Sequence, residues 1–207
     1  KMIQKPMFSQ QTEWVPPDSF PDLSKYDEIA IDLETKDPEL KTMGSGSITG
    51  KGEIVGIALA VEGWSGYYPI AHEGGGNLDK KKVLDWFKTI LNYDSVKIFH
   101  NAMYDVCFIR AAGLKINGLI VDTMIAGSLV DENRFRYDLG SMGRDYLGKG
   151  KNEAVLAETA NIGGIDAKSE MYKLPAMYVG EYAERDAELT LDLWQEMRKE
   201  INHQDIE

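Results

Sequence analysis

The chain lacks the residues from which a cross-linked or membrane-spanning protein is made. One cysteine among 207 residues excludes a disulfide framework and any zinc site built from several cysteines. No apolar run is long enough to cross a bilayer, and the first residues carry no secretory signal. We therefore expect a soluble protein of the cell interior with no membrane partner.

Basic residues are also scarce. There are 23 lysines and arginines against 34 acidic residues, which gives a formal net charge of −11. Proteins that bind nucleic acid alone are usually basic, because they must approach a polyanion. One modest basic cluster contains Arg134, Arg136, Arg144, Lys149 and Lys151. Acids are interleaved with it, so a phosphate contact and a solvated surface are equally good interpretations. Phe135 and Tyr137 could stack on bases there, although we expect at least one to pack in the core.

Strand patterns alternate with helix patterns along the chain, which indicates α/β architecture. Apolar alternation and short apolar runs predict strands at 27–35, 54–61, 66–69, 96–99 and 119–121. Helical spacing predicts helices at 79–91, 103–112, 123–130, 139–146 and 179–201. Between them, residues 39–51 are expected to be a mobile surface connection and 74–76 an exposed glycine turn. Residues 143–149 have P-loop spacing, but Gly150 stands where Ser or Thr is required, so we treat the match as chance.

The first strand carries two acids on one side. Ile29, Ile31 and Leu33 alternate with polar positions, so one face of the strand is apolar. Asp32 and Glu34, two residues apart, then project from the other face. Their carboxylates can converge on one cation, and such hard oxygen ligands suit Mg²⁺ or Mn²⁺. Taken alone, a strand with a solvated polar face explains the pair more often.

A second acid lies at the start of a predicted helix. After the run 96–99, His100 and Asn101 look like a turn and an N-cap, in which the Asn101 side chain accepts from free helical N–H groups. Asp105 then falls in the first helical turn, where the helix dipole favours negative charge. That dipole explains Asp105 without a metal, and His100 is expected to be a hydrogen-bonded turn residue.

The last helix carries a third acidic pattern. Asp186 lies on its apolar stripe, and Tyr182 lies one turn earlier on the same face. A carboxylate on a core-facing stripe is costly unless it pairs with a base or binds a metal. Arg185 is the neighbouring base, but it points elsewhere on the helical wheel, which weakens the ion-pair interpretation.

Together, the three patterns resemble the Exo I, Exo II and Exo III motifs of the DEDD 3′–5′ exonuclease superfamily. The tyrosine of the third pattern is typical of the DEDDy branch. Within it, the chain is most similar to the proofreading domains of DNA polymerase I-type (family A) enzymes, especially those of phages. The strings that carry the resemblance are FHNAMYD at 99–105, VDTMIA at 121–126 and YAERDAELT at 182–190. The resemblance covers about residues 20 to 200, and residues 148–175 match no family feature that we can assign.

The resemblance implies the ribonuclease H-like fold, with a mixed five-stranded sheet flanked by helices. It implies two Mg²⁺ or Mn²⁺ ions about 3.5–4 Å apart. Asp32, Glu34 and Asp186 would hold the ion that binds the attacking water. Asp32 would also touch the second ion, which Asp105 would hold largely through water. Tyr182 would orient the water, since a phenol with a pKa near ~10 is a poor base at neutral pH.

The implied substrate is the 3′ end of single-stranded or frayed DNA, from which nucleoside 5′-monophosphates are released. Asn101 and Thr35 would contact the terminal nucleotide. Residues 1–20 are then an extended lead-in, and residues 21–207 an exonuclease domain, a fragment of a larger polymerase. A C-terminal polymerase domain would supply the grip on duplex DNA, in the cytoplasm of a bacterial host or phage-infected cell. Two alternatives remain open: 3′ trimming of RNA, as in ribonuclease D-like proteins, and a catalytically silent docking domain.

Overall fold

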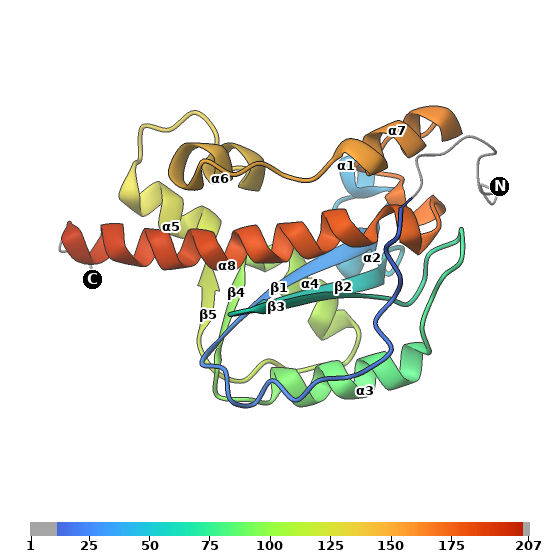
Figure 1. The fold of residues 1–207 in the computed structure, drawn as a ribbon, viewed down its shortest axis with the longest axis horizontal. Helices are drawn as coiled ribbons and strands as arrows, with labels where there is room; N and C mark the ends of the chain where they lie inside the picture. Colours follow the sequence, from blue (N-terminus) through green and yellow to red (C-terminus); the bar gives the residue numbers. More distant parts are fainter. Residues whose placement is uncertain (1–11, 205–207) are drawn as a thin grey trace.

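A mixed five-stranded sheet occupies the centre of the computed structural model, which describes residues 12–204 (Figure 1). Its strands are β1 (Glu28–Lys36), β2 (Glu53–Val61), β3 (Trp64–Pro69), β4 (Val96–Phe99) and β5 (Ile120–Asp122). Their order in the sheet is β3-β2-β1-β4-β5. The pairs β1–β2 and β2–β3 are antiparallel, whereas β1–β4 and β4–β5 are parallel. The predicted five-stranded mixed sheet is confirmed.

Five helices lie where helical spacing predicted them, within a few residues at each end. They are α3 (Lys80–Leu91), α4 (Ala102–Ala111), α5 (Thr123–Val130), α6 (Leu139–Leu147) and α8 (Gly180–His203). Several other elements were not predicted: α1 (Leu40–Met43), α2 (Gly46–Thr49), α7 (Ala154–Gly163), and the 3₁₀ turns η1 (Met171–Lys173) and η2 (Ala176–Tyr178). All of these lie in segments that lack a long amphipathic period.

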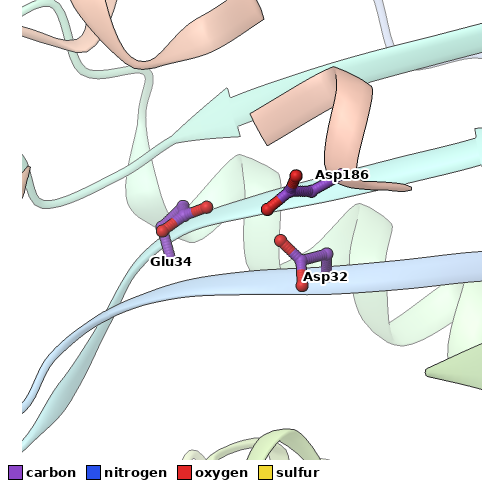
Figure 2. Close-up of side chains that lie close together, drawn as sticks. All are labelled: Asp32, Glu34 and Asp186. Atoms are coloured by element: carbon purple, nitrogen blue, oxygen red, sulfur yellow. The ribbon is translucent and has the colours of Figure 1, made fainter. Parts of the chain in front are cut away.

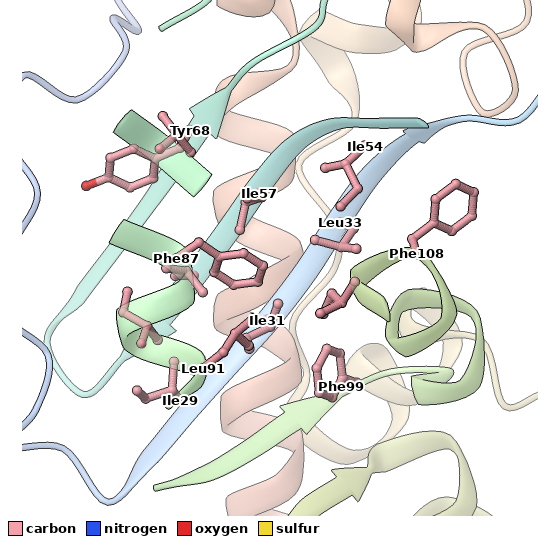
Figure 3. Packing of buried hydrophobic residues seen from close by; sticks show 14 of the residues in the cluster. Ile29, Ile31, Leu33, Ile54, Ile57, Tyr68, Phe87, Leu91, Phe99 and Phe108 are labelled. Carbon is pink, nitrogen blue, oxygen red and sulfur yellow. The ribbon is translucent and has the colours of Figure 1, made fainter. Parts of the chain in front are cut away.

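The two faces of the sheet are covered by different helices. Helix α8 lies along one face, and α3 and α4 lie against the other (Figure 1). Ile29, Ile31 and Leu33 of β1 point into the core formed with α3 and α4, where Phe87 and Phe99 also pack (Figure 3). The opposite side of β1 therefore faces α8, as the alternation in its sequence predicted. Because both faces are covered, polar groups on the α8 side are withdrawn from water.

The connection at 39–51 folds back onto the end of β1 instead of forming an irregular loop. The Asp37 carboxylate accepts hydrogen bonds from the Gly46 N–H at 3.0 and 3.1 Å. Gly46 is buried, and a Cβ placed there would come 2.5 Å from the Gly52 Cα. This close backbone contact needs glycine at both positions. It depends on tertiary packing, which explains why hydrophobic periodicity did not reveal it.

The glycine turn at 74–76 is packed against a distant part of the chain. The Glu73 N–H donates to the Tyr172 carbonyl at 2.8 Å, and the Ala176 N–H donates to the Gly75 carbonyl at 3.0 Å. A Cβ at Gly74 would lie 2.2 Å from the Pro175 nitrogen. The expectation of an exposed turn is therefore wrong for Gly74 and Gly75, which are half-buried. Only the partner segment, about a hundred residues away, shows why glycine is needed.

Residues 12–20 form neither helix nor strand and cross the molecule beside α8. The Trp14 indole N–H donates to Glu184 Oε1 at 2.9 Å, and the Phe20 ring stacks on Tyr68 with centroids 5.7 Å apart. The rest of the predicted lead-in, residues 1–11, lies outside the described residues, as do 205–207. A domain boundary at residue 21 stays a prediction.

We predict that Gly56→Ala destabilises the fold. Gly56 of β2 is paired with Glu34 of β1, and a Cβ there would lie 2.0 Å from the hydroxyl of Tyr67. Tyr67 is fully buried and its hydroxyl bonds His72 at 2.6 Å, so the ring has no free space to enter. Overpacking of this kind costs about 1–3 kcal/mol in the free energy of unfolding, measured by denaturant titration. Gly150→Ala is the control, because a Cβ at Gly150 meets nothing within 4 Å; equal stability of both variants would contradict the prediction.

Candidate metal centre

Three carboxylates converge between β1 and α8. Asp32 and Glu34 project from the strand and Asp186 from the helix, and the three side chains point toward one another (Figure 2). One ligand oxygen from each lies within 4.8 Å of the other two. Glu34 and Asp186 are buried, and Asp32 is half-buried. The structure thus brings together two of the three sequence patterns at one point.

Small side chains allow α8 to lie close to the sheet at this point. Ala183 and Ala187 on the helix are fully buried against a cluster that includes Ala30 and Ala58 of the strands. Alanine permits a closer approach of helix and sheet than a larger side chain would, because little volume has to be filled between them. The carboxylates, which leave the same surfaces of β1 and α8, are consequently held near one another.

Asp105 stands next to this group rather than within it. It is buried in the first turn of α4, and its Oδ2 accepts a hydrogen bond from the Leu33 N–H at 3.3 Å. Leu33 is the residue between Asp32 and Glu34, so this bond ties the second sequence pattern to the first. Burial and the charge of Asp32 raise the pKa of Asp105 well above its usual range.

Burial and mutual repulsion dominate the electrostatics of the site. Desolvation, followed by the charge of Asp186, raises the pKa of Asp32 to about 8. Burial is also the main reason why the pKa values of Glu34 and Asp186 are raised. Each carboxylate makes its neighbours harder to ionise. A group of acids arranged in this way gains stability from any cation that it can bind.

Lys151 supplies a positive charge that the sequence did not reveal as part of the site. Its Nζ lies 3.1 Å from Asp186 Oδ2 and 3.3 Å from the hydroxyl of Tyr182. Arg185 does point elsewhere, as predicted: it contacts Glu188 at 3.4 Å and the Gly150 carbonyl. The base that pairs with Asp186 was therefore present but 35 residues away in the chain. Lys151 lies in an irregular segment, where no periodicity indicates which way a side chain points.

Tyr182 shares the inward face of α8 with Asp186, as its spacing predicted. It is buried, with its ring beneath the Lys151 ammonium, which lies 5.3 Å from the ring centroid. Burial and the charge of Asp186 raise the pKa of the Tyr182 phenol above its ordinary value. The phenol is therefore protonated at neutral pH, and its oxygen accepts a hydrogen bond from Lys151.

Asn101 begins α4 in a different way from the one predicted. Its backbone is left-handed, with φ 65° and ψ 61°, and its side chain makes no capping bond. The cap comes from Asp122, which accepts from the Asn101 N–H at 3.0 Å and from the Ala102 N–H at 2.9 Å. Asn101 is thus the N-cap residue of α4, as predicted, but the expected capping bond from its side chain is absent. Asparagine remains suited to this position because it tolerates positive φ better than most residues.

His100, beside Asn101, is a hydrogen-bonded turn residue as predicted. Its Nε2 lies 2.7 Å from the Tyr137 carbonyl, and its Nδ1 lies 2.8 Å from the Thr123 hydroxyl. Because a carbonyl only accepts, Nε2 carries the proton. The bond to Tyr137 fastens the segment between α5 and α6 to the turn that holds Asn101. Tyr137 packs against the core, whereas Phe135 is fully exposed, so the two aromatics differ as expected.

Thr35, which follows Glu34 in β1, lines a cavity. The cavity has a volume of about 200 Å³, and Thr35, Asp37, Lys41, Tyr104 and Lys168 line part of it. The Tyr104 hydroxyl donates to Asp37 Oδ2 at 2.9 Å, so the Thr35 hydroxyl, also at 2.9 Å, donates to Tyr104. Thr35 is thus oriented by a chain of hydrogen bonds that ends on a carboxylate.

The residues of the site fit a divalent cation. The converging ligands are all carboxylate oxygens, which Mg²⁺ and Mn²⁺ prefer. Asp186 Oδ1 is buried, and no group among residues 12–204 offers it a hydrogen bond. A buried carboxylate oxygen without a partner is costly, and an ion bound at this position would satisfy it. Sequence, burial and charge therefore agree on a metal centre.

Residues 11–202 match the 3′-5′ exonuclease domain family of A-type DNA polymerases, and the chain belongs to this family. Members of the family depend on divalent metal ions. A DNA-directed DNA polymerase of Pseudomonas phage M6 is 35% identical and covers 99% of this chain and 32% of its own length. The DNA polymerase DpoZ of Acinetobacter phage SH-Ab 15497 is 27% identical over 91% of this chain and 29% of its own length. The chain thus spans about a third of the curated relatives it matches.

Solved structures share the fold at lower sequence identity. Brucella melitensis NrnC with bound Mg²⁺ has a TM-score of 0.60 and 16% identity, covering 92% of this chain and 81% of that one. RNase D of Escherichia coli, an exoribonuclease involved in structured RNA processing, has a TM-score of 0.59 and 16% identity. It covers 87% of this chain and 41% of its own. These likenesses confirm the ribonuclease H-like fold. In the described part of the chain, no helix has the length and apolar character needed to span a membrane.

We predict that the metal-free protein loses stability as the pH rises from about pH 4 to about pH 8, above which its stability levels off. The folded-state pKa of Asp32, about 8, lies above its unfolded value, so the folded form holds the proton more tightly. The resulting stabilisation is complete below the unfolded pKa and is lost as the pH rises through about 8. The midpoint of thermal unfolding in EDTA measures the effect. The decrease should be smaller in Asp32→Asn, and a midpoint that rises with pH would be inconsistent with this site.

Proposed function

We propose that the chain is a DEDDy-type exonuclease domain that removes nucleotides from the 3′ end of single-stranded DNA with the help of two Mg²⁺ or Mn²⁺ ions. The observation that supports it most is the convergence of Asp32, Glu34 and Asp186 between β1 and α8. Membership of the 3′-5′ exonuclease family supports this reaction, and the convergence of the carboxylates supports its assignment to this site. When bound, the two ions would activate a water and stabilise the leaving oxygen.

The side chains then have separate tasks. Asp32, Glu34 and Asp186 hold one ion, and Asp32 with Asp105 holds the second. Asp105 suits an outer position, because it lies beside the three-carboxylate group and is fixed by the Leu33 N–H. Four negative charges in a buried site also repel a phosphodiester, so the substrate binds there only after the cations have offset them.

Tyr182 orients the attacking water. Its phenol stays protonated because burial and neighbouring carboxylates raise its pKa, so it is unsuited to accepting a proton. A fixed hydroxyl next to Asp186 can instead hydrogen-bond the nucleophile and hold it in line with the phosphorus. This positioning reduces the entropy that the reacting groups must lose.

The 3′-terminal nucleotide is contacted by Asn101 and Thr35. The left-handed turn leaves the Asn101 side chain exposed at the start of α4, close in sequence to Asp105. Thr35 follows Glu34 directly and lines a cavity. Asn101 thus lies at the start of the helix that carries Asp105, and Thr35 lies on the strand that carries Asp32 and Glu34, where a terminal nucleotide would enter.

The domain works as the editing part of a polymerase. The curated relatives carry the names of DNA polymerases and are about three times longer than this chain. We infer that residues 21–207 form the exonuclease domain and that a C-terminal polymerase domain supplies the duplex grip. If another domain holds the duplex, a domain with a net charge of −11 can still act on a polyanion such as DNA. Because the relatives come from phages and bacteria, we place its action in the bacterial cytoplasm.

We predict that Asp32→Asn or Asp186→Asn lowers the cleavage rate by about a hundredfold or more, the usual scale for loss of one group that stabilises the transition state. A single-stranded DNA labelled at its 5′ end is incubated with Mg²⁺ or Mn²⁺. The expected result is a ladder that shortens from the 3′ end, with mononucleotides released, and that EDTA stops. Asp192→Asn is the control, because Asp192 pairs with Lys149 outside the site.

Each other outcome selects a different function. Near-parent cleavage by either variant would reject the site. Intact DNA together with trimming of the matching RNA would favour a ribonuclease D-like activity. If neither polymer is cut although the protein is folded, the domain is a catalytically silent docking module.

We predict that Phe135→Ala weakens the binding of single-stranded DNA. Phe135 is fully exposed, and its segment is fastened to His100, next to Asn101, by the Tyr137 carbonyl. Stacking of one base on an aromatic ring is worth about 1–3 kcal/mol, so KM should rise by about tenfold with kcat little changed. Leu119→Ala is a matched control, because Leu119 is also exposed but lies just before β5, at the end of that strand away from α5. An unchanged KM in Phe135→Ala would remove Phe135 from the substrate path.

A further inference from the structure

Lys151 is a cation placed inside a group of acids that already suits a metal. It lies in the segment between α6 and α7, and its side chain is 21% exposed, against 6% for that of Asp186. Its ammonium contacts Asp186 Oδ2 at 3.1 Å and the Tyr182 hydroxyl at 3.3 Å. Both partners belong to the inward face of α8.

The positive charge of Lys151 lies close to all three carboxylates of the cluster, those of Asp32, Glu34 and Asp186. The Lys151 Nζ lies 3.1 Å from Asp186 Oδ2, and one ligand oxygen each of Asp32, Glu34 and Asp186 lies within 4.8 Å of the other two. In the protein without a metal, Lys151 is thus the counter-ion of the buried carboxylates. Leaving such charges unpaired would be strongly destabilising.

A divalent ion and this ammonium oppose each other. Two cations that share one carboxylate a few ångströms apart repel, and little water lies between them to screen the charges. Lysine is a point charge on a flexible four-carbon stem, so its ammonium can leave Asp186 by rotation of the side chain. The segment that carries Lys151 contains Gly148 and Gly150, and side chains added at either position would meet nothing within 4 Å. The backbone on the N-terminal side of Lys151 is therefore loosely packed at these two glycines.

We propose that Lys151 and a divalent cation are alternative partners of Asp186, so that Lys151 sets the affinity of the site for metal. The inference rests on the metal site proposed above. Lys151 keeps the carboxylates together in the absence of metal, and each binding event has to displace it from Asp186. Metal affinity is therefore weaker than the four carboxylates alone would give.

The test is a titration of the 207-residue chain with Mn²⁺ by isothermal titration calorimetry, with no substrate present. Lys151→Met should bind Mn²⁺ about tenfold more tightly than the parent, the scale of coupling between two neighbouring charges. Lys151→Arg keeps the charge and should bind like the parent. Lys149→Met is the matched control: it removes the same charge two residues away, where Lys149 pairs with Asp192. Its affinity should change by much less.

Thermal unfolding is a second measurement, which tests the proposal even if a variant is less stable than the parent. In EDTA, Lys151→Met should have a lower midpoint of thermal unfolding than the parent, and saturating Mn²⁺ should remove the difference. Lys151→Gln, which keeps a hydrogen-bond donor without the charge, replaces Lys151→Met if that variant is unfolded. Equal or weaker Mn²⁺ binding by the neutral variants would overturn the competition while leaving the metal site intact. A parent protein that binds no Mn²⁺ would overturn the metal site and this inference together.

Discussion

Repulsion among buried carboxylates is the constraint to which the rest of the domain is adapted. Asp32, Glu34, Asp105 and Asp186 lie close together beneath α8, and desolvation raises the pKa of each. A protein would ordinarily avoid such an arrangement, because charged groups without compensation are costly to bury. Here the fold forces the acids together, since strand β1 and helix α8 are fixed by the apolar residues that surround them.

The energy for this arrangement comes from packing on both sides of the sheet. The large apolar side chains face α3 and α4, whereas alanines dominate where α8 crosses β1 and β2. Large residues supply most of the hydrophobic stabilisation, because it scales with the apolar area removed from water. The small residues allow α8 to lie close to the sheet. The large residues thus form a stable core on the α3 and α4 side of the sheet. On the α8 side the space between helix and sheet is small, and the carboxylates fill it.

Much of this could be predicted from the sequence, and the reasons for the failures are physical. The sides on which Asp32, Glu34, Tyr182 and Asp186 lie follow from the periods of strand and helix, and the structure agrees. Lys151 and Asp122 were missed because each acts on residues at least twenty positions away, from places where no period fixes its direction. Gly46 and Gly74 were assigned to loops, although each allows a close backbone contact that only the folded chain creates.

Asp122 also connects the two halves of the site. Its single carboxylate binds the N–H groups of Asn101 and Ala102 at the start of α4, and that of Met124 at the start of α5. Helix α5 packs in turn against α8. A continuous series of contacts therefore links Asp105 on α4, through Asp122 and α5, to Asp186 on α8. The relative positions of Asp105 and Asp186 are therefore supported by Asp122 and α5, neither of which belongs to the group of converging carboxylates.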